Sequence, residues 1–282
     1  MPLDTDLVEV ARRHLPEPVA DRWIGLLRPG LWLRKALPGE SVVARLGGLP
    51  ELPRDVGWPR WKGQGWLGFV AAIDCGSLPA DSLDIALPGD GTLLFFYRDR
   101  DEVVGTWAPE TQAGARVTYV PAGVPTSPRS TPSGVPTYRE VALTAEAIVT
   151  GPDWDHPAFR ASITDLAPEH RAFMDDYRNR DDFAWALSDL VGRPWHGVGG
   201  HADPVQGPVE MDAAQVVLGG RADWTGPAVH EEAQRWVLLA QIDSDEEANM
   251  CWGDVGTLYW LVRPADLRAR DFDRAVFTWQ CG

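Results

Sequence analysis

Two short stretches carry the strongest information about the fold: WLGFVAAID at residues 66–74 and WVLLAQID at residues 236–243. Each begins at Trp, continues as an apolar run and ends in Ile-Asp, and the two align with one gap. An apolar run of this length, bounded by polar and turn residues, is typical of a buried strand. The pair therefore predicts two strands at equivalent places in two copies of one motif.

The sequence around the two stretches repeats in the same order. Downstream, Gly-Thr-Leu begins both residues 91–95 and residues 256–260, and upstream a Gly-Gly pair occurs at 47–48 and at 199–200. Glycine pairs permit a left-handed backbone, and an Asp at a strand end can accept hydrogen bonds from the following turn. We therefore predict two diverged β-rich units around a pseudo-twofold axis, with a cleft between them. A chance alignment of short apolar strands is the alternative.

The remaining segments predict an α+β fold with antiparallel or mixed sheets and with N-terminal and central helices. Helical spacing of apolar residues marks helices at 6–14, 19–27 and 169–190, the last with Tyr177 and Trp185 on its buried face. Apolar runs predict further strands at 31–37, 41–46, 92–97, 257–262 and 275–280. Proline lacks the backbone donor of a β-ladder, so the Pro-rich residues 120–136 are expected to form a surface loop.

We divide the chain, a single domain of residues 1–282, into four parts. Residues 1–40 hold the N-terminal helices and a lead-in strand, and residues 41–120 form the first unit. Residues 121–195 hold the Pro-rich loop and the central helix, and residues 196–282 form the second unit.

Composition predicts a cytoplasmic protein that binds neither nucleic acid nor membranes. The 41 acidic and 26 basic residues give a net charge of -15, which repels phosphate backbones and anionic lipids but attracts a basic partner. No apolar run reaches the roughly 20 residues that span a bilayer, and the first residues do not resemble a secretory signal. Cys75, Cys251 and Cys281 lack C-x-x-C spacing, which argues against a disulfide framework or a thiolate metal site.

Several blocks match the motifs of a known family. They are LGGLPELP at 46–53, GHADPVQ at 200–206, LLAQIDSDEE at 238–247 and WGDVGTLY at 252–259. On these blocks the chain resembles the YwqG-like family, a bacterial domain of unknown function, from about residue 45 to residue 281. The resemblance implies an α+β fold and a cytoplasmic protein without an agreed reaction. Members beside secreted-toxin loci imply an immunity-type or toxin-binding role.

A group of carboxylates near the end of the second repeated strand is a candidate site. Asp243, Asp245 and Asp254 are candidates for binding a divalent cation such as Mg²⁺ or Ca²⁺, which prefers oxygen ligands. Neighbouring carboxylates can also serve as acid and base. The spacing does not fit the twelve-residue calcium loop, and the alternative is a turn in which Asp243 and Asp254 accept backbone hydrogen bonds. No other cofactor is expected.

Other residues near the repeated blocks are candidates for binding a ligand. Imidazoles can act as ligands or bases, although two His residues five positions apart do not share a helix face. Several of the 14 tryptophans could line the cleft and contact a peptide. The complete set of ligand-binding candidates is His196, His201, Gln206, Gln241, Asp243, Asp245, Trp252 and Asp254.

The sequence favours a binding protein over an enzyme. It contains no Gly-x-Ser-x-Gly motif and no Gly-x-Gly-x-x-Gly or phosphate-loop motif. The leading prediction is a non-catalytic protein- or peptide-binding module with a partner that is a protein or peptide, expected to be basic. The alternative is a metal-assisted hydrolase that uses Asp243, Asp245 and Asp254. No motif identifies the ligand, a reaction or the oligomeric state.

Overall fold

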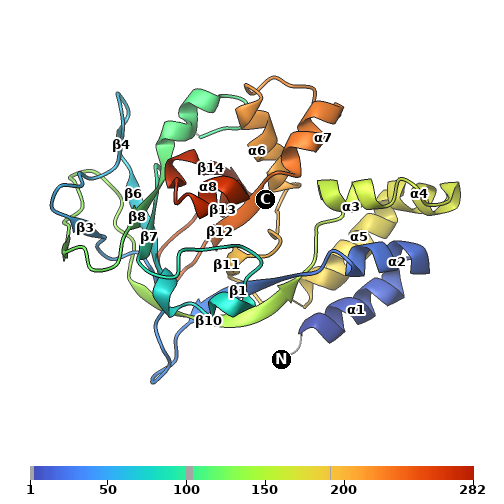
Figure 1. Cartoon of the computed structure of the whole chain (residues 1–282), viewed down its shortest axis with the longest axis horizontal. Helices are drawn as coiled ribbons and strands as arrows, with labels where there is room; N and C mark the ends of the chain where they lie inside the picture. The colour runs from blue at the N-terminus through green and yellow to red at the C-terminus, as the bar shows by residue number, and fades with distance from the viewer. Residues whose placement is uncertain (1–2, 100–103, 191) are drawn as a thin grey trace.

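The computed structural model describes residues 3–99, 104–190 and 192–282. In these ranges the largest feature is a ten-stranded antiparallel sheet (Figure 1). Its strands are β1 (Arg28–Lys35), β2 (Ala44–Leu46), β6 (Gly68–Asp74), β7 (Thr92–Tyr97), β8 (Ala115–Val120), β10 (Val141–Thr150), β11 (His196–Gly199), β12 (Val237–Asp243), β13 (Thr257–Val262) and β14 (Val276–Gln280). Their order in the sheet is β14-β13-β12-β11-β1-β10-β2-β6-β7-β8.

The sheet curls until it is nearly closed. Phe95 of β7 packs edge-on against Trp260 of β13, with ring centroids 5.0 Å apart, and Tyr97 stacks on Phe277 of β14 at 4.8 Å. The Gln112 side chain, in the 3₁₀ segment η3 (Pro109–Gly114), accepts from the Phe277 amide and donates to its carbonyl, both at 2.9 Å. The two ends of the sheet therefore enclose one apolar core.

Two groups of helices lie outside the sheet (Figure 1). The first group packs around buried Trp23, Phe159 and Phe183. Its members are α1 (Leu3–His14), α2 (Glu17–Ile24), α3 (Pro157–Ser162), α4 (Pro168–Asp175) and α5 (Tyr177–Ser188). The second group, α6 (Val209–Val217) and α7 (Pro227–Ala233), packs near β13 and β14, and α8 (Pro264–Arg268) connects these two strands. Short pairs, β3 (Glu51–Pro53) with β9 (Thr126–Pro128) and β4 (Arg60–Trp61) with β5 (Gly65–Trp66), stand apart from the main sheet.

Two runs of the sheet, β2-β6-β7-β8 and β11-β12-β13-β14, flank the central strands β1 and β10. Asp74 pairs with Thr92 in the first run, and Asp243 pairs with Thr257 in the second. The register shifts once in each run, between Phe69 and Ala71 and between Leu238 and Ala240. Both Gly-Gly pairs adopt positive φ: 56° and 72° at 47–48, and 63° and 67° at 199–200.

The helix predicted at 169–190 is wrong as one element. Asp176 has an extended backbone, and its carboxylate accepts a hydrogen bond from the Arg178 amide, so α4 ends there and α5 begins. Tyr177 and Trp185, predicted to be buried, are 62% and 72% exposed. The loop predicted at 120–136 contains the short strand β9.

The prediction of mixed helices and sheets is confirmed, and the pairings in the main sheet are antiparallel. None of the helices in the described ranges combines the length and the apolar character that crossing a bilayer requires.

Candidate functional site

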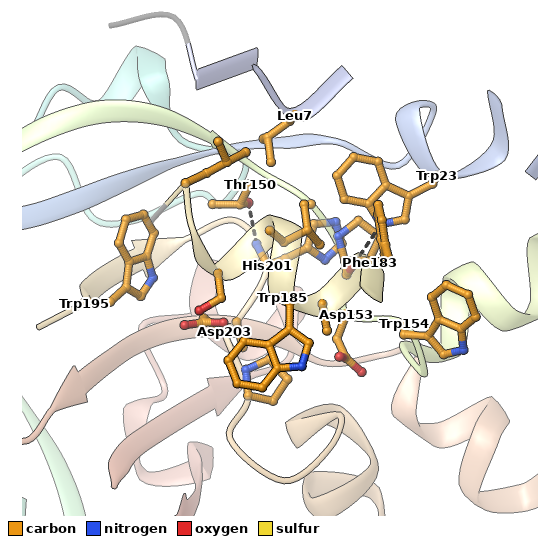
Figure 2. Close-up of a pocket in the computed structure, with 18 of the residues that line it drawn as sticks. Leu7, Trp23, Thr150, Asp153, Trp154, Phe183, Trp185, Trp195, His201 and Asp203 are labelled. Carbon is orange, nitrogen blue, oxygen red and sulfur yellow. Dashed lines mark hydrogen bonds between the residues drawn. The ribbon is translucent and has the colours of Figure 1, made fainter. Parts of the chain in front are cut away.

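A cavity of about 400 Å³ opens between α5, the end of β10 and the segment that follows β11 (Figure 2). Its apolar wall is largely aromatic and includes Trp23, Trp154, Phe183, Trp185 and Trp195. Its polar wall contains Asp153, Asp181, Arg193, His201 and Asp203. Mostly apolar cavities of this size with a few polar groups are the usual form of ligand sites.

His201 is fixed in the wall by two hydrogen bonds. Its backbone amide donates to the Thr150 hydroxyl at 2.8 Å (Figure 2), and its ring Nε2 lies 2.8 Å from the Leu26 carbonyl. Because a carbonyl only accepts, Nε2 carries the ring proton and Nδ1 is an acceptor. Nδ1 is buried and has no hydrogen-bond partner among the described residues.

The His201 ring is uncharged at neutral pH. Burial and the nearby His156 lower its pKa to about 3. The His156 ring stands edge-on to it, with centroids 4.9 Å apart, and its own Nδ1 accepts from the Ala158 amide. The His201 ring in the cavity wall is therefore neutral, and its Nδ1 is a buried acceptor.

Asp153 is a partly buried carboxylate in the segment that follows the end of β10. One oxygen accepts from the Asp155 amide at 2.9 Å. Burial raises the pKa of Asp153 to about 6. No ion pair to Asp153 occurs within the part of the chain that the structure describes, so its charge is poorly compensated.

Arg193 joins this cavity to a second, more open pocket of about 720 Å³. Its guanidinium donates to Asp203 in the first cavity and to Asp243 at 2.9 Å in the second. The Asp243 side chain also accepts from the Trp195 amide at 2.7 Å and from the Thr257 hydroxyl at 2.7 Å. Asp243 thus holds Arg193 and Trp195 in place and has its oxygens occupied by internal donors.

His196 and Asp245 form a buried pair below the second pocket. His196 Nδ1 accepts from the Asp243 amide at 3.2 Å, so Nε2 is the protonated nitrogen and donates to Asp245 Oδ2 at 3.3 Å. The other Asp245 oxygen accepts from the Ala248 amide at 2.7 Å. The hydrogen bond from His196 holds the pKa of Asp245 below its usual value.

The remaining predicted residues mostly support the backbone. The Gln241 side chain accepts from the Asp203 amide and donates to the Trp195 carbonyl, which links two walls of the first cavity. Gln206 donates to the Cys281 carbonyl at 2.8 Å. Trp252 is 1% exposed and packs edge-on against Tyr138.

The eight predicted residues are therefore divided between different places. His201 lines the first cavity, and Asp243, Asp245 and exposed Asp254 line the second. His196, Gln206, Gln241 and Trp252 are not among the lining residues of either one. Across the described ranges, no group of three or more His, Cys, Asp or Glu side chains is placed to hold a metal ion.

Sequence reasoning missed Asp153, Trp185, Trp195 and Asp203 as site residues. Asp203 stands in the GHADPVQ block, so it was available as a candidate. The helical pattern predicts Trp185 on a buried face, and Asp153 and Trp195 carry no local pattern that separates them from other residues of their types.

Comparison with known proteins gives a family and one relative. The family model described as a domain of unknown function, DUF1963, matches residues 44–281. A UDP-N-acetylmuramate--L-alanine ligase of Chloroflexus aggregans (strain MD-66 / DSM 9485) is 28% identical over 193 residues. The alignment covers 64% of this chain and 38% of the ligase, so the chain spans less than half of that protein.

Proposed function

This chain belongs to the family of the domain of unknown function DUF1963, and we propose that it is a non-catalytic protein- or peptide-binding module. The binding site is the cavity beside α5. One observation carries the proposal: the wall of an aromatic cavity contains a desolvated carboxylate, Asp153, for which no ion pair is found in the described structure, and a His201 ring whose Nδ1 has no hydrogen-bond partner there. Such costs are typical of functional sites.

Two further features favour binding over catalysis. Trp185 is 72% exposed at the cavity, and a large exposed aromatic side chain is a common anchor in protein interfaces. The lowered pKa of His201, about 3, makes its ring a weak proton acceptor, which is unfavourable for a general base working near neutral pH.

Selection from a library of short random peptides, followed by fluorescence anisotropy with the whole chain, tests the proposal. Trp185→Ala should weaken the selected peptides about tenfold, or about 1.4 kcal/mol. Tyr177→Ala is the matched control, because Tyr177 is an exposed aromatic residue on the same helix that does not line the cavity. Failure to select any peptide, or equal losses in both variants, would contradict the proposal.

We further propose that the protein is cytoplasmic and belongs to the YwqG-like part of its family. Its proposed partner is a basic protein or peptide, and an immunity-type role is one function that such binding could serve. The net charge of -15 supports a basic partner through electrostatic attraction.

The duplication is also proposed. The runs β2-β6-β7-β8 and β11-β12-β13-β14 share their strand order, their Asp–Thr pairing and the place of their register shift. The left-handed Gly-Gly pairs follow β2 and overlap the end of β11. These shared details support descent from one unit better than a similar composition does.

The metal-assisted hydrolase remains the alternative proposal. The oxygens of Asp243 and of Asp245 accept internal hydrogen bonds, which favours supporting roles for both. Calorimetric titration with Mg²⁺, Mn²⁺, Ca²⁺ and Zn²⁺ tests this alternative. Saturable binding that Asp254→Asn abolishes would favour the hydrolase over the binding module.

A further inference from the structure

The wall of the cavity carries more negative than positive charge. Arg193 is shared between Asp203 and Asp243, so this group of three carries one net negative charge when both carboxylates are ionised. Asp181 is paired with its neighbour Arg180. Asp153 adds a second negative charge for which no ion pair is found among the described residues. A bound cation would lower the electrostatic cost of this arrangement.

The hydrogen-bonding groups select the same kind of ligand. The Asp153 carboxylate is an acceptor, and burial beside His156 keeps the His201 ring neutral, with its ring proton directed to Leu26 and its buried Nδ1 an acceptor. A carboxylate or phosphate group would bring further acceptors and negative charge to these positions. A guanidinium brings five N–H donors and no acceptor.

The aromatic wall of the cavity suits the aliphatic stem of a side chain that ends in a guanidinium. Trp185 and Trp195 line the cavity together with Leu187 and Leu190. Aliphatic stems of basic side chains pack on apolar surface while their charged heads remain near polar groups. Guanidinium groups also stack on indole faces more often than ammonium groups do.

We propose that the cavity holds an arginine side chain of a partner polypeptide, with the guanidinium at the Asp153 and His201 wall and the stem against the Trp185 wall. The inference rests on the proposed binding function and extends it by naming the anchoring group of the partner. Figure 2 shows Asp153, Trp185, His201 and Asp203 around the same space.

NMR titration of the whole chain with blocked amino acids tests this proposal. The probes are N-acetyl-argininamide, its neutral near-isostere N-acetyl-citrullinamide, and N-acetyl-lysinamide. We expect the arginine probe to shift the Trp185 indole resonance saturably and to bind about tenfold more tightly than the citrulline probe. The resonance is assigned by its loss in Trp185→Phe.

Two carboxylate variants provide the matched comparison. Asp153→Asn should remove the preference for arginine over citrulline. Asp155→Asn should keep it, because Asp155 is exposed, does not line the cavity and donates to Asp153 from its backbone amide, which the substitution retains. The comparison of probes on the unaltered protein stands even if Asp153→Asn does not fold.

The outcomes separate the two proposals. Selected peptides that depend on Trp185, combined with equal binding of arginine and citrulline, overturn this inference and leave the binding function standing. Equal binding of the lysine probe overturns the choice of arginine. If neither peptides nor probes affect Trp185, both proposals are overturned.

Discussion

The two runs of the sheet end their second strands in Asp, but the two side chains have different surroundings. Asp74 is exposed and accepts from two groups close in sequence, the Gly76 amide at 3.0 Å and the Ser77 hydroxyl at 2.7 Å. Asp243 is 4% exposed and accepts from Trp195 and Arg193, residues more than 40 positions earlier in the chain. Similar backbones can therefore end in a local turn or fix the wall of a distant cavity, and only the second run does the latter.

The largest expected effect tests whether the two runs of the sheet contribute equally to the stability of the fold. Ile73 and Ile242 are 1% and 0% exposed, so changing either to Ala should cost about 2–5 kcal/mol through lost burial and a new cavity. Urea unfolding of both variants gives the values. Leu37→Ala, at a 60% exposed position, is the control and should change stability by less than about 0.5 kcal/mol. A large loss at only one Ile would break the comparison.

The next test separates the two aspartates. Asp243→Asn should cost about 3 kcal/mol, because it leaves Arg193 without one charged partner and directs amide hydrogens toward groups that donate. Asp74→Asn should cost less than about 1 kcal/mol, since its hydrogen bonds are local and exposed. Thermal or urea unfolding measures both. Equal losses would show that Asp243 has no special supporting role.

The Gly-Gly pairs allow a comparison of stability with binding. A Cβ on Gly200, at φ +67°, would lie 2.5 Å from the Thr150 hydroxyl, and a Cβ on Gly47, at φ +56°, would lie 2.5 Å from the Arg139 carbonyl. Either change to Ala should cost about 1–3 kcal/mol. Because Thr150 also accepts from the His201 amide, Gly200→Ala should weaken peptide binding as well. Anisotropy that shows equal binding losses for both variants would contradict this distinction.

The last test concerns pH and a residue outside both runs, and its effect is limited to a window of pH. The pKa of Asp153 is about 6 in the folded chain against an ordinary 3.8, so folding takes up a proton between these values. The destabilising contribution of this carboxyl should therefore decrease as pH falls from about 6 toward 3.8. Asp153→Asn should be more stable than the native protein above pH 6, with the difference closing over that window. Urea unfolding at several pH values checks it, with Asp155 and His156 nearby as the other titratable groups.

Asp155→Asn is the control for the dependence of stability on pH. It retains the Asp153 carboxyl and should keep most of the native slope of unfolding free energy against pH. An Asp153→Asn variant with the native slope would show that this carboxyl is not the responsible group.

The sequence was most informative where an element is apolar along its whole length. The strand predicted at 257–262 is β13, which is buried throughout. In contrast, β10 has the sequence VALTAEAIVT, where Ala, Thr and Glu replace the larger apolar residues, and it was missed. Its stability comes from pairing with β1 and β2 on both sides, which are distant in sequence.

The site was harder to predict because it depends on packing between separate segments. His196 and His201 are close in sequence, but the left-handed Gly199 and Gly200 lie between them. His196 consequently faces Asp245 in the core, while His201 lies against the helices and hydrogen-bonds Leu26. The partners Asp153 and Trp185 come from segments whose positions relative to His201 no local pattern encodes.

The central strands pair segments that lie far apart in the sequence. Near the N-terminus, β1 pairs with β10 and β11, whereas β10, from the middle of the chain, pairs with β1 and β2. Severing the chain after β8 would leave each piece with strand edges whose hydrogen-bonding partners lie in the other piece, and unpaired edges are sites of aggregation. A shorter version of the present chain would therefore keep the whole main sheet and shorten loops and helices instead.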